Sequence, residues 1–173
     1  MNTITPFQPY TSNINCGPGQ PPPRPAVPDC YTKEQALDAL LKAEGDANEA
    51  RSDFRVIQGN LKGDEALKDA TEQFLRVLYQ EGTNYTSLAQ KDYEMIGNFL
   101  KPGETRKDAV DQFLKLMKAE GNRDDAVSDY ILINRYVSPK ETREQATDQF
   151  MRLLYKVGTG YTNQAQNNFI LIH

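Results

Sequence analysis

The feature that most constrains this chain is a stretch that occurs twice, once from Thr71 to Ile96 and again from Thr147 to Ile172. The two copies align without a gap at an offset of 76 (147 − 71). The similarity continues upstream, where KAEGDANEARSDF from Lys42 matches KAEGNRDDAVSDY from Lys118. Self-similarity at a fixed period is the signature of repeat architectures. The sequence therefore predicts that a helical unit is present in two copies.

Within each copy, apolar residues recur at helical spacing and no strand pattern interrupts them. Glycines that suit helix ends recur at spacings of 37, 39 and 37, namely Gly45, Gly82, Gly121 and Gly158. One aromatic residue stands in the second helix of each expected hairpin, and we expect all four in the core: Phe54, Tyr93, Tyr130 and Phe169. Such periods are typical of helical-hairpin arrays. We predict an all-α fold of eight helices, as two tandem four-helix units that form an α-array or a single bundle.

Several polar residues stand where helix starts are expected. Ser, Thr and Asp side chains accept hydrogen bonds from the first free backbone amides of a helix, and a Glu or Gln three residues later completes a capping box. On this basis we expect caps at Thr32, Asp46, Asp64, Thr86, Ser138 and Thr162. In the third helix, Leu75 and Tyr79 widen the apolar arc, which predicts that this helix is covered on two sides.

The domain organisation follows from two composition changes. Residues 1–30 are rich in proline and polar residues and form an expected extended arm, and Pro102-Gly103 separates a first unit, 31–102, from a second, 103–173. Pro22, Pro25 and Pro28 have the spacing that polyproline II-binding grooves recognise. The arm is therefore either a stiff linker laid over the body or, through residues 20–28, a ligand for an SH3-like or other polyproline-binding partner.

The charge and the cysteines restrict compartment and partners. A net charge of −4 argues against nucleic acid, no apolar run is long enough to span a membrane, and no signal peptide is visible. Cys16 and Cys30 are expected to be free thiols, although in an oxidising compartment they could close a loop worth about 3 kcal/mol. The uncharged first dozen residues, rich in Ser, Thr and Asn, resemble the leaders of bacterial type III secreted proteins. We expect a cytoplasmic protein or one secreted by a signal-peptide-independent route.

Catalytic signatures are scarce in the sequence. His173 is the only histidine, and there is no phosphate-binding glycine loop, dinucleotide fingerprint or nucleophile elbow. Asp53, Asp92 and Asp129 each precede a core aromatic residue, and we expect them to be solvated or to cap a helix. We therefore predict no enzyme activity, no cofactor and no metal site.

Two sets of residues are candidates for partner binding. The first consists of Gln–cation pairs three residues apart, which are neighbours on a helix surface: Gln73 and Arg76, Gln112 and Lys115, Gln149 and Arg152. They form either a binding strip for an acidic or peptide partner or, the favoured interpretation, polar bonds to the adjacent hairpin.

The second set is four tyrosines found only in the second hairpin of each copy: Tyr79, Tyr85, Tyr155 and Tyr161. Exposed tyrosines are enriched at binding hot spots, whereas buried ones bond their hydroxyls within the core. We expect Tyr85 and Tyr161 to be surface contacts, either to a partner or to each other across a pseudo-twofold axis.

These observations support three hypotheses for function. The first is a non-enzymatic helical-repeat module for protein–protein interaction, which rests on the repeats. The second is a secreted bacterial effector or adaptor that binds a host protein, which rests on the leader. The third and least favoured is a carboxylate-based hydrolase.

Overall fold

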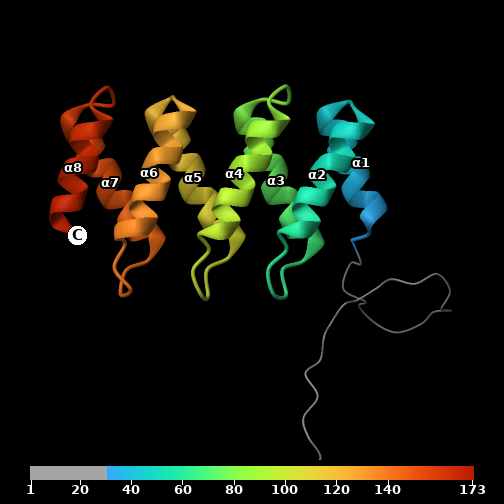
Figure 1. Ribbon diagram of the computed structural model, residues 1–173, viewed down its shortest axis with the longest axis horizontal. Coiled ribbons are helices and arrows are strands. Elements are labelled where there is room, and N and C mark those ends of the chain that lie inside the picture. Colours follow the sequence, from blue (N-terminus) through green and yellow to red (C-terminus); the bar gives the residue numbers. More distant parts are fainter. Residues whose placement is uncertain (1–30) are drawn as a thin grey trace, which may run out of the picture.

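The computed structural model describes residues 31–173, in which every regular element is an α-helix, as predicted. The eight helices of this part of the chain are arranged as a row of hairpins (Figure 1). Their bounds are α1 Lys33–Glu44, α2 Ala47–Gly59, α3 Leu67–Glu81, α4 Thr86–Asn98, α5 Arg106–Glu120, α6 Arg123–Tyr136, α7 Arg143–Val157 and α8 Thr162–Ile172. The predictions for the arm, its prolines, Cys16 and Cys30 lie outside the described residues.

The hairpins form two layers of helices. In one layer α3 packs between α1 and α5, and α5 packs between α3 and α7; in the other, α2 packs on α4 and α6 on α8 (Figure 1). The fold is therefore an array rather than a bundle closed around one axis. We call the outer surface of α1, α3, α5 and α7 the odd-helix face. Packing of α3 on α5 crosses Pro102-Gly103, and the division into two units there stays a prediction.

The four predicted core aromatics are buried, which confirms the periodicity from which they were predicted. Three of them meet a phenylalanine of the preceding helix edge to face, with ring centroids 5.4 to 5.7 Å apart: Phe74 with Tyr93, Phe113 with Tyr130, and Phe150 with Phe169. Edge-to-face packing is a favoured geometry for aromatic pairs. The hydrophobic core is continuous through all four hairpins.

The helix ends agree only partly with the expected caps. Thr32 forms a capping box with Gln35, and Asp46 accepts from the amides of Asn48 and Glu49, as predicted. Asp64 does not cap a helix, because α3 begins later, after Ala66. Ser138 was likewise wrong as a cap: the chain turns there first, and Thr142 caps α7 instead.

Candidate functional site

Aromatic and aliphatic side chains gather on the odd-helix face. Tyr79 on α3 and Tyr155 on α7 are 61% and 59% exposed, so the expectation that Tyr79 would be covered was wrong. One turn earlier, the half-buried Leu75 and Met151 occupy the same register, and Leu114 occupies it on α5. The face therefore combines an apolar row with projecting tyrosines.

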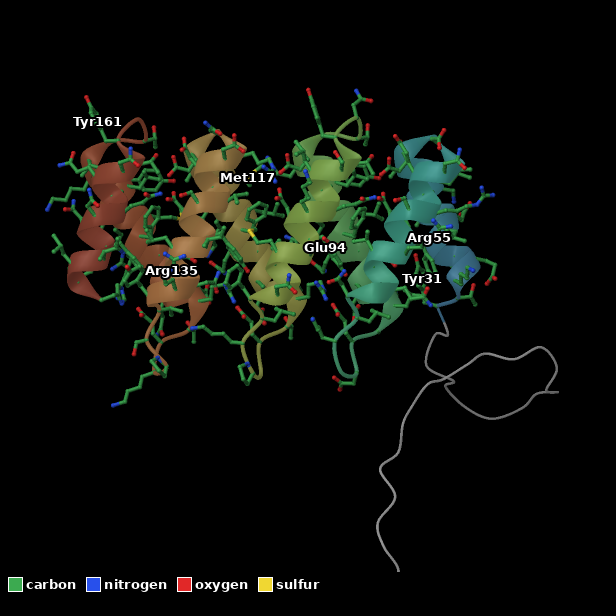
Figure 2. All side chains as sticks on the ribbon, viewed as in Figure 1. Tyr31, Arg55, Glu94, Met117, Arg135 and Tyr161 are labelled. Carbon is green, nitrogen blue, oxygen red and sulfur yellow. The ribbon has the colours of Figure 1, made fainter. Side chains whose placement is uncertain are left out.

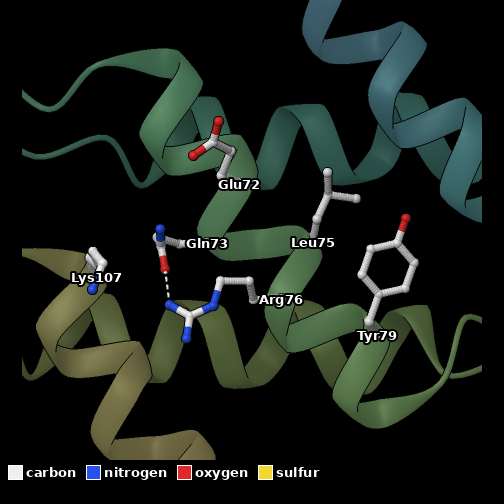
Figure 3. A pocket seen from close by; sticks show the side chains of 6 residues that line it. All are labelled: Glu72, Gln73, Leu75, Arg76, Tyr79 and Lys107. Carbon is white, nitrogen blue, oxygen red and sulfur yellow. Dashed lines mark hydrogen bonds between the residues drawn. The ribbon is translucent and has the colours of Figure 1, made fainter.

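A shallow depression of about 470 Å³ lies on this face beside α3 (Figure 3). Leu75 and Tyr79 supply its apolar side chains, and charged side chains reach it from the same helix and from α5. The lining residues are Glu72, Gln73, Leu75, Arg76, Tyr79 and Lys107. An aromatic ring, an aliphatic floor and a charged rim are the groups that hold an extended peptide.

The Gln–cation pairs mostly connect neighbouring odd helices. Arg76 donates to Gln73 on its own helix at 2.7 Å and to Asp111 of α5 at 2.5 Å. Lys115 lies 3.6 Å from the carboxylate of Asp148 on α7. Gln73 is itself buried. These contacts agree with the favoured interpretation of bonds to the adjacent hairpin.

The other members of this set behave differently. Gln112 is buried in α5, whereas Gln149 is half-buried and lies 2.9 Å from His173. Arg152 is exposed on α7 and forms no ion pair within residues 31–173. The structure therefore does not assemble the three pairs into one uniform strip.

Tyr85 and Tyr161 stand at the hairpin tips directly before α4 and α8. Each ring lies over a loop glycine, since a Cβ built on Gly82 or Gly158 would be 3.5 Å from it. The rings nevertheless remain 57% and 64% exposed, and Figure 2 shows Tyr161 projecting from the array. Of the two expected alternatives, a contact of Tyr85 with Tyr161 does not occur within one chain, because the whole hairpin α5–α6 separates them (Figure 1).

The clearest departure from expectation is a set of buried carboxyl pairs at the same end of the hairpins. Asp53, Asp92 and Asp129 are buried rather than solvated. Each lies beside the glutamate that ends the preceding odd helix, which gives the pairs Glu44–Asp53, Glu81–Asp92 and Glu120–Asp129. These pairs lie at the junctions with the following hairpins.

Donors from the next hairpin hold the third of these pairs. Glu120 accepts from the hydroxyl of Thr162 at 2.9 Å, and Asp129 accepts from the amide of Gln166 at 2.7 Å. The remaining oxygens, Glu120 Oε1 and Asp129 Oδ2, have no donor among residues 31–173. Burial, followed by the neighbouring Glu120 carboxyl, raises the pKa of Asp129 to about 9, so Asp129 keeps its proton at neutral pH.

The first junction repeats these contacts. Thr86 donates to Glu44 at 2.7 Å and Gln90 donates to Asp53 at 2.6 Å. Thr86, like Thr162, is the first residue of its helix and not the cap, because its hydroxyl is committed to the preceding hairpin. The predicted caps at these two threonines were therefore wrong.

Protonation differs between the junctions. Burial, followed by the hydrogen bond from the partner carboxyl, raises the pKa of Asp53 to about 8 and that of Asp129 to about 9. At the middle junction burial and Asp92 raise the pKa of Glu81 to about 7, although Arg123 opposes the shift. The Arg123 guanidinium bonds both oxygens of Asp92. A cation therefore stabilises Asp92 at the middle junction, whereas the raised pKa values of Asp53 and Asp129 keep those two carboxyl groups protonated at neutral pH.

At the opposite ends of the hairpins, arginines join neighbouring units. The Arg106 side chain is buried and donates to Glu65 at 2.7 Å and to the carbonyl of Asn60 at 2.5 Å. Its guanidinium also lies 4.3 Å from the centre of the Tyr93 ring. A Cβ on Gly97 would be 2.8 Å from this guanidinium, which explains a glycine inside α4.

Arg143 repeats this arrangement one hairpin later. It donates to Glu104 at 2.6 Å and to the carbonyl of Phe99, and it lies over the Tyr130 ring. Asn134 bonds the guanidinium at the position that corresponds to Gly97. The sequence analysis did not identify either arginine. The signal that could have found them is shared by both: each is the first residue of a helix and follows a glutamate by two positions.

The chain was compared with known proteins by sequence and by structure. Comparisons with protein-family models, with curated proteins and with solved structures found no match. Within residues 31–173, no group of three or more His, Cys, Asp or Glu side chains is placed to hold a metal ion. In the same part of the chain, no helix has the length and apolar character needed to cross a membrane.

Proposed function

We propose that this chain is a non-enzymatic helical-repeat module that binds a protein or peptide through the odd-helix face. The observation that carries the proposal is the pair Tyr79 and Tyr155, which project at the same register two hairpins apart. Tyrosine supplies a large contact area at a low cost in side-chain entropy and is enriched at binding hot spots.

The surroundings of the two rings support a peptide-sized partner. Leu75, Leu114 and Met151 form a row of half-buried apolar side chains beside them. Lys42 and Lys118 occupy the tyrosine register in the first and third hairpins, so that cations alternate with rings along the face. An extended ligand that crosses successive helices would meet both kinds of side chain.

The buried carboxyl pairs are better explained as parts of the hairpin junctions than as catalytic groups. Glu120 and Asp129 are held by side chains of the next hairpin, as are their counterparts at the first junction. Groups committed to inter-hairpin bonds in more than one repeat favour an architectural role. The effector hypothesis depends on the leader, which lies outside the described residues, and stays a prediction.

The proposal is tested by capture of partners on the immobilised full-length chain, with cross-linking and mass spectrometry to locate the contact. We expect the double variant Tyr79→Ala, Tyr155→Ala to lose the captured partner. The matched control is Tyr85→Ala, Tyr161→Ala, which removes two equally exposed rings from the hairpin tips. Loss of capture in the control, with retention in the first variant, would move the site to the tips and contradict the proposal.

A further inference from the structure

The depression on α3 has the chemistry of a polyproline-binding groove. Tyr79 supplies an aromatic wall and Leu75 an aliphatic floor, and the exposed carboxylate of Glu72 lies at the rim (Figure 3). Aromatic-lined grooves bind polyproline II segments because such ligands lose little conformational entropy on binding. The depression therefore suits a proline-rich ligand that carries a positive charge.

The charges around the depression are already paired, with one exception. Arg76 and Lys107 both bond to Asp111, at 2.5 and 2.8 Å. Glu72 forms no ion pair within residues 31–173. A ligand cation would therefore find Glu72 available.

The chain itself contains a segment with these properties. Pro22, Pro25 and Pro28 recur every third residue, which is one turn of a polyproline II helix. Arg24 lies between them and is the only charged residue before Asp29. The segment therefore combines a proline-rich face with the positive charge that the depression suits.

The described part of the chain begins just before α1, which packs against α3, the helix that carries most of this depression. Burial raises the pKa of the Tyr31 hydroxyl, and the negative charges of Glu72 and Asp38 raise it further. Tyr31 therefore lies close to Glu72. Figure 2 shows Tyr31 at the start of the array. The residues before Tyr31 are thus connected to the body beside Glu72.

The arm is long enough to reach Tyr79. Tyr31 has the register of Lys68, since both lie 14 residues before a hairpin glycine (45 − 31 = 82 − 68). From Lys68 to Tyr79 is about 16 Å along α3, and one interhelical step adds about 9 Å sideways. The direct path is therefore about 19 Å. In the polyproline II conformation, residues 22–28 would span about the same length as this path.

We propose that residues 20–28 of this chain bind the depression on α3 within the same molecule, with Arg24 paired to Glu72 and a proline against Tyr79. This inference deepens the proposed function, and rests on it, because an arm on the odd-helix face would compete with an external partner. The arm is then a built-in ligand of the binding face.

The test places a nitroxide spin label on Cys16 of the otherwise full-length chain, with Cys30→Ser as the only other change. We expect selective paramagnetic broadening of the backbone amide signals of Leu75 and Tyr79. Broadening should disappear in the variant with Pro22, Pro25 and Pro28 all changed to Ala. It should also disappear in Glu72→Lys, in which the cation of Arg24 is repelled.

The matched control is Tyr155→Ala, which removes an equally exposed tyrosine two hairpins away and should leave the broadening unchanged, whereas Tyr79→Ala abolishes it. In a second measurement, a synthetic peptide of residues 18–29 should bind the triple Pro→Ala chain at least about tenfold more tightly than the wild-type chain. The reason is that the tethered arm competes at an effective concentration in the millimolar range.

Three results would overturn the inference: no broadening at Leu75 and Tyr79, broadening that persists in the Pro→Ala variant, or equal affinity of the peptide for both chains. Isotope-labelled chains without a spin label can also be mixed with spin-labelled chains that are not isotope-enriched. Broadening in this mixture would show that the arm binds a second copy of the chain, and would also overturn the inference. These readouts need no external partner. Partner capture by the Pro→Ala variant separately reports whether the proposed function fails.

Discussion

Replacement of Asp129 by asparagine should change how the stability of the fold depends on pH. In the folded chain, burial and Glu120 raise the pKa of Asp129 to about 9, whereas an unfolded aspartate titrates near pH 3.9. Between these values the folded state binds one more proton than the unfolded state. The free energy of unfolding therefore falls as pH rises, by up to about 1.4 kcal/mol per pH unit for this pair.

Asp129→Asn removes the titrating carboxyl group but keeps a donor for the pair. The asparagine amide can donate to Glu120, while the Gln166 amide can still donate to the asparagine oxygen. The free energy of unfolding of the variant, relative to that of the wild type, should rise with pH by about 2.7 kcal/mol between roughly pH 6 and pH 8. Asn168 occupies the corresponding position in the last hairpin, where Val157 replaces the glutamate.

The measurement is urea unfolding followed by circular dichroism at several pH values, with Asp64→Asn as the control. Asp64 is exposed in a turn, so its replacement should leave the wild-type pH dependence in place. The argument is refuted if Asp129→Asn and the wild type lose stability in parallel as pH rises. In that case the carboxyl pair does not hold a proton in the folded state.

Three other predictions follow from the core and the arm. Arg143→Ala should cost about 3–5 kcal/mol because it removes the buried cation that is paired with the largely covered Glu104, and urea unfolding measures the loss. Phe169→Ala should cost about 3–5 kcal/mol, and an unchanged melting temperature would show that α8 is not docked. Deletion of residues 1–28 should preserve the helical circular dichroism signal, because the eight helices bury a core among themselves; a large loss of helix would contradict this.

The helices and the core could be predicted from the sequence because both depend on local periodicity. The spacing of apolar residues is set by the helix itself, so Tyr93 and Tyr130 could be placed in the core without knowledge of any neighbour. Glycines such as Gly45 and Gly121, both with positive φ, mark the helix ends for an equally local reason.

The buried carboxyl pairs could not be predicted in this way because their burial is decided by a different hairpin. An aspartate beside a core residue is usually solvated, and nothing adjacent to Asp129 indicates otherwise. The donors to this pair, Thr162 to Glu120 and Gln166 to Asp129, come from more than 30 positions later. A glutamate directly before the hairpin glycine in three repeats was the available signal, and the fourth repeat changes it to Val157.

The residue directly before the second helix of each hairpin differs between the hairpins in whether its side chain caps the helix. In the first and third hairpins it holds Asp46 and Asn122, whose side chains cap the helix. In the second and fourth it holds Tyr85 and Tyr161, which make no side-chain cap bond. Side-chain caps are typically worth about 1 kcal/mol. The tyrosines therefore occupy a place where another residue would stabilise the helix more.

This comparison yields a last prediction, which concerns Tyr161. Tyr161→Ala should cost less than about 1 kcal/mol, as is usual for exposed residues. Tyr161→Asp should be more stable than Tyr161→Ala by about 0.5–1 kcal/mol, because a carboxylate favours a helix N-terminus. Urea unfolding of both variants decides the matter. If Tyr161→Ala instead loses several kcal/mol, the ring over Gly158 is a packing element of the hairpin. If both small effects are found, packing does not require this tyrosine, and Tyr161→Ala is a folded control for the capture experiment.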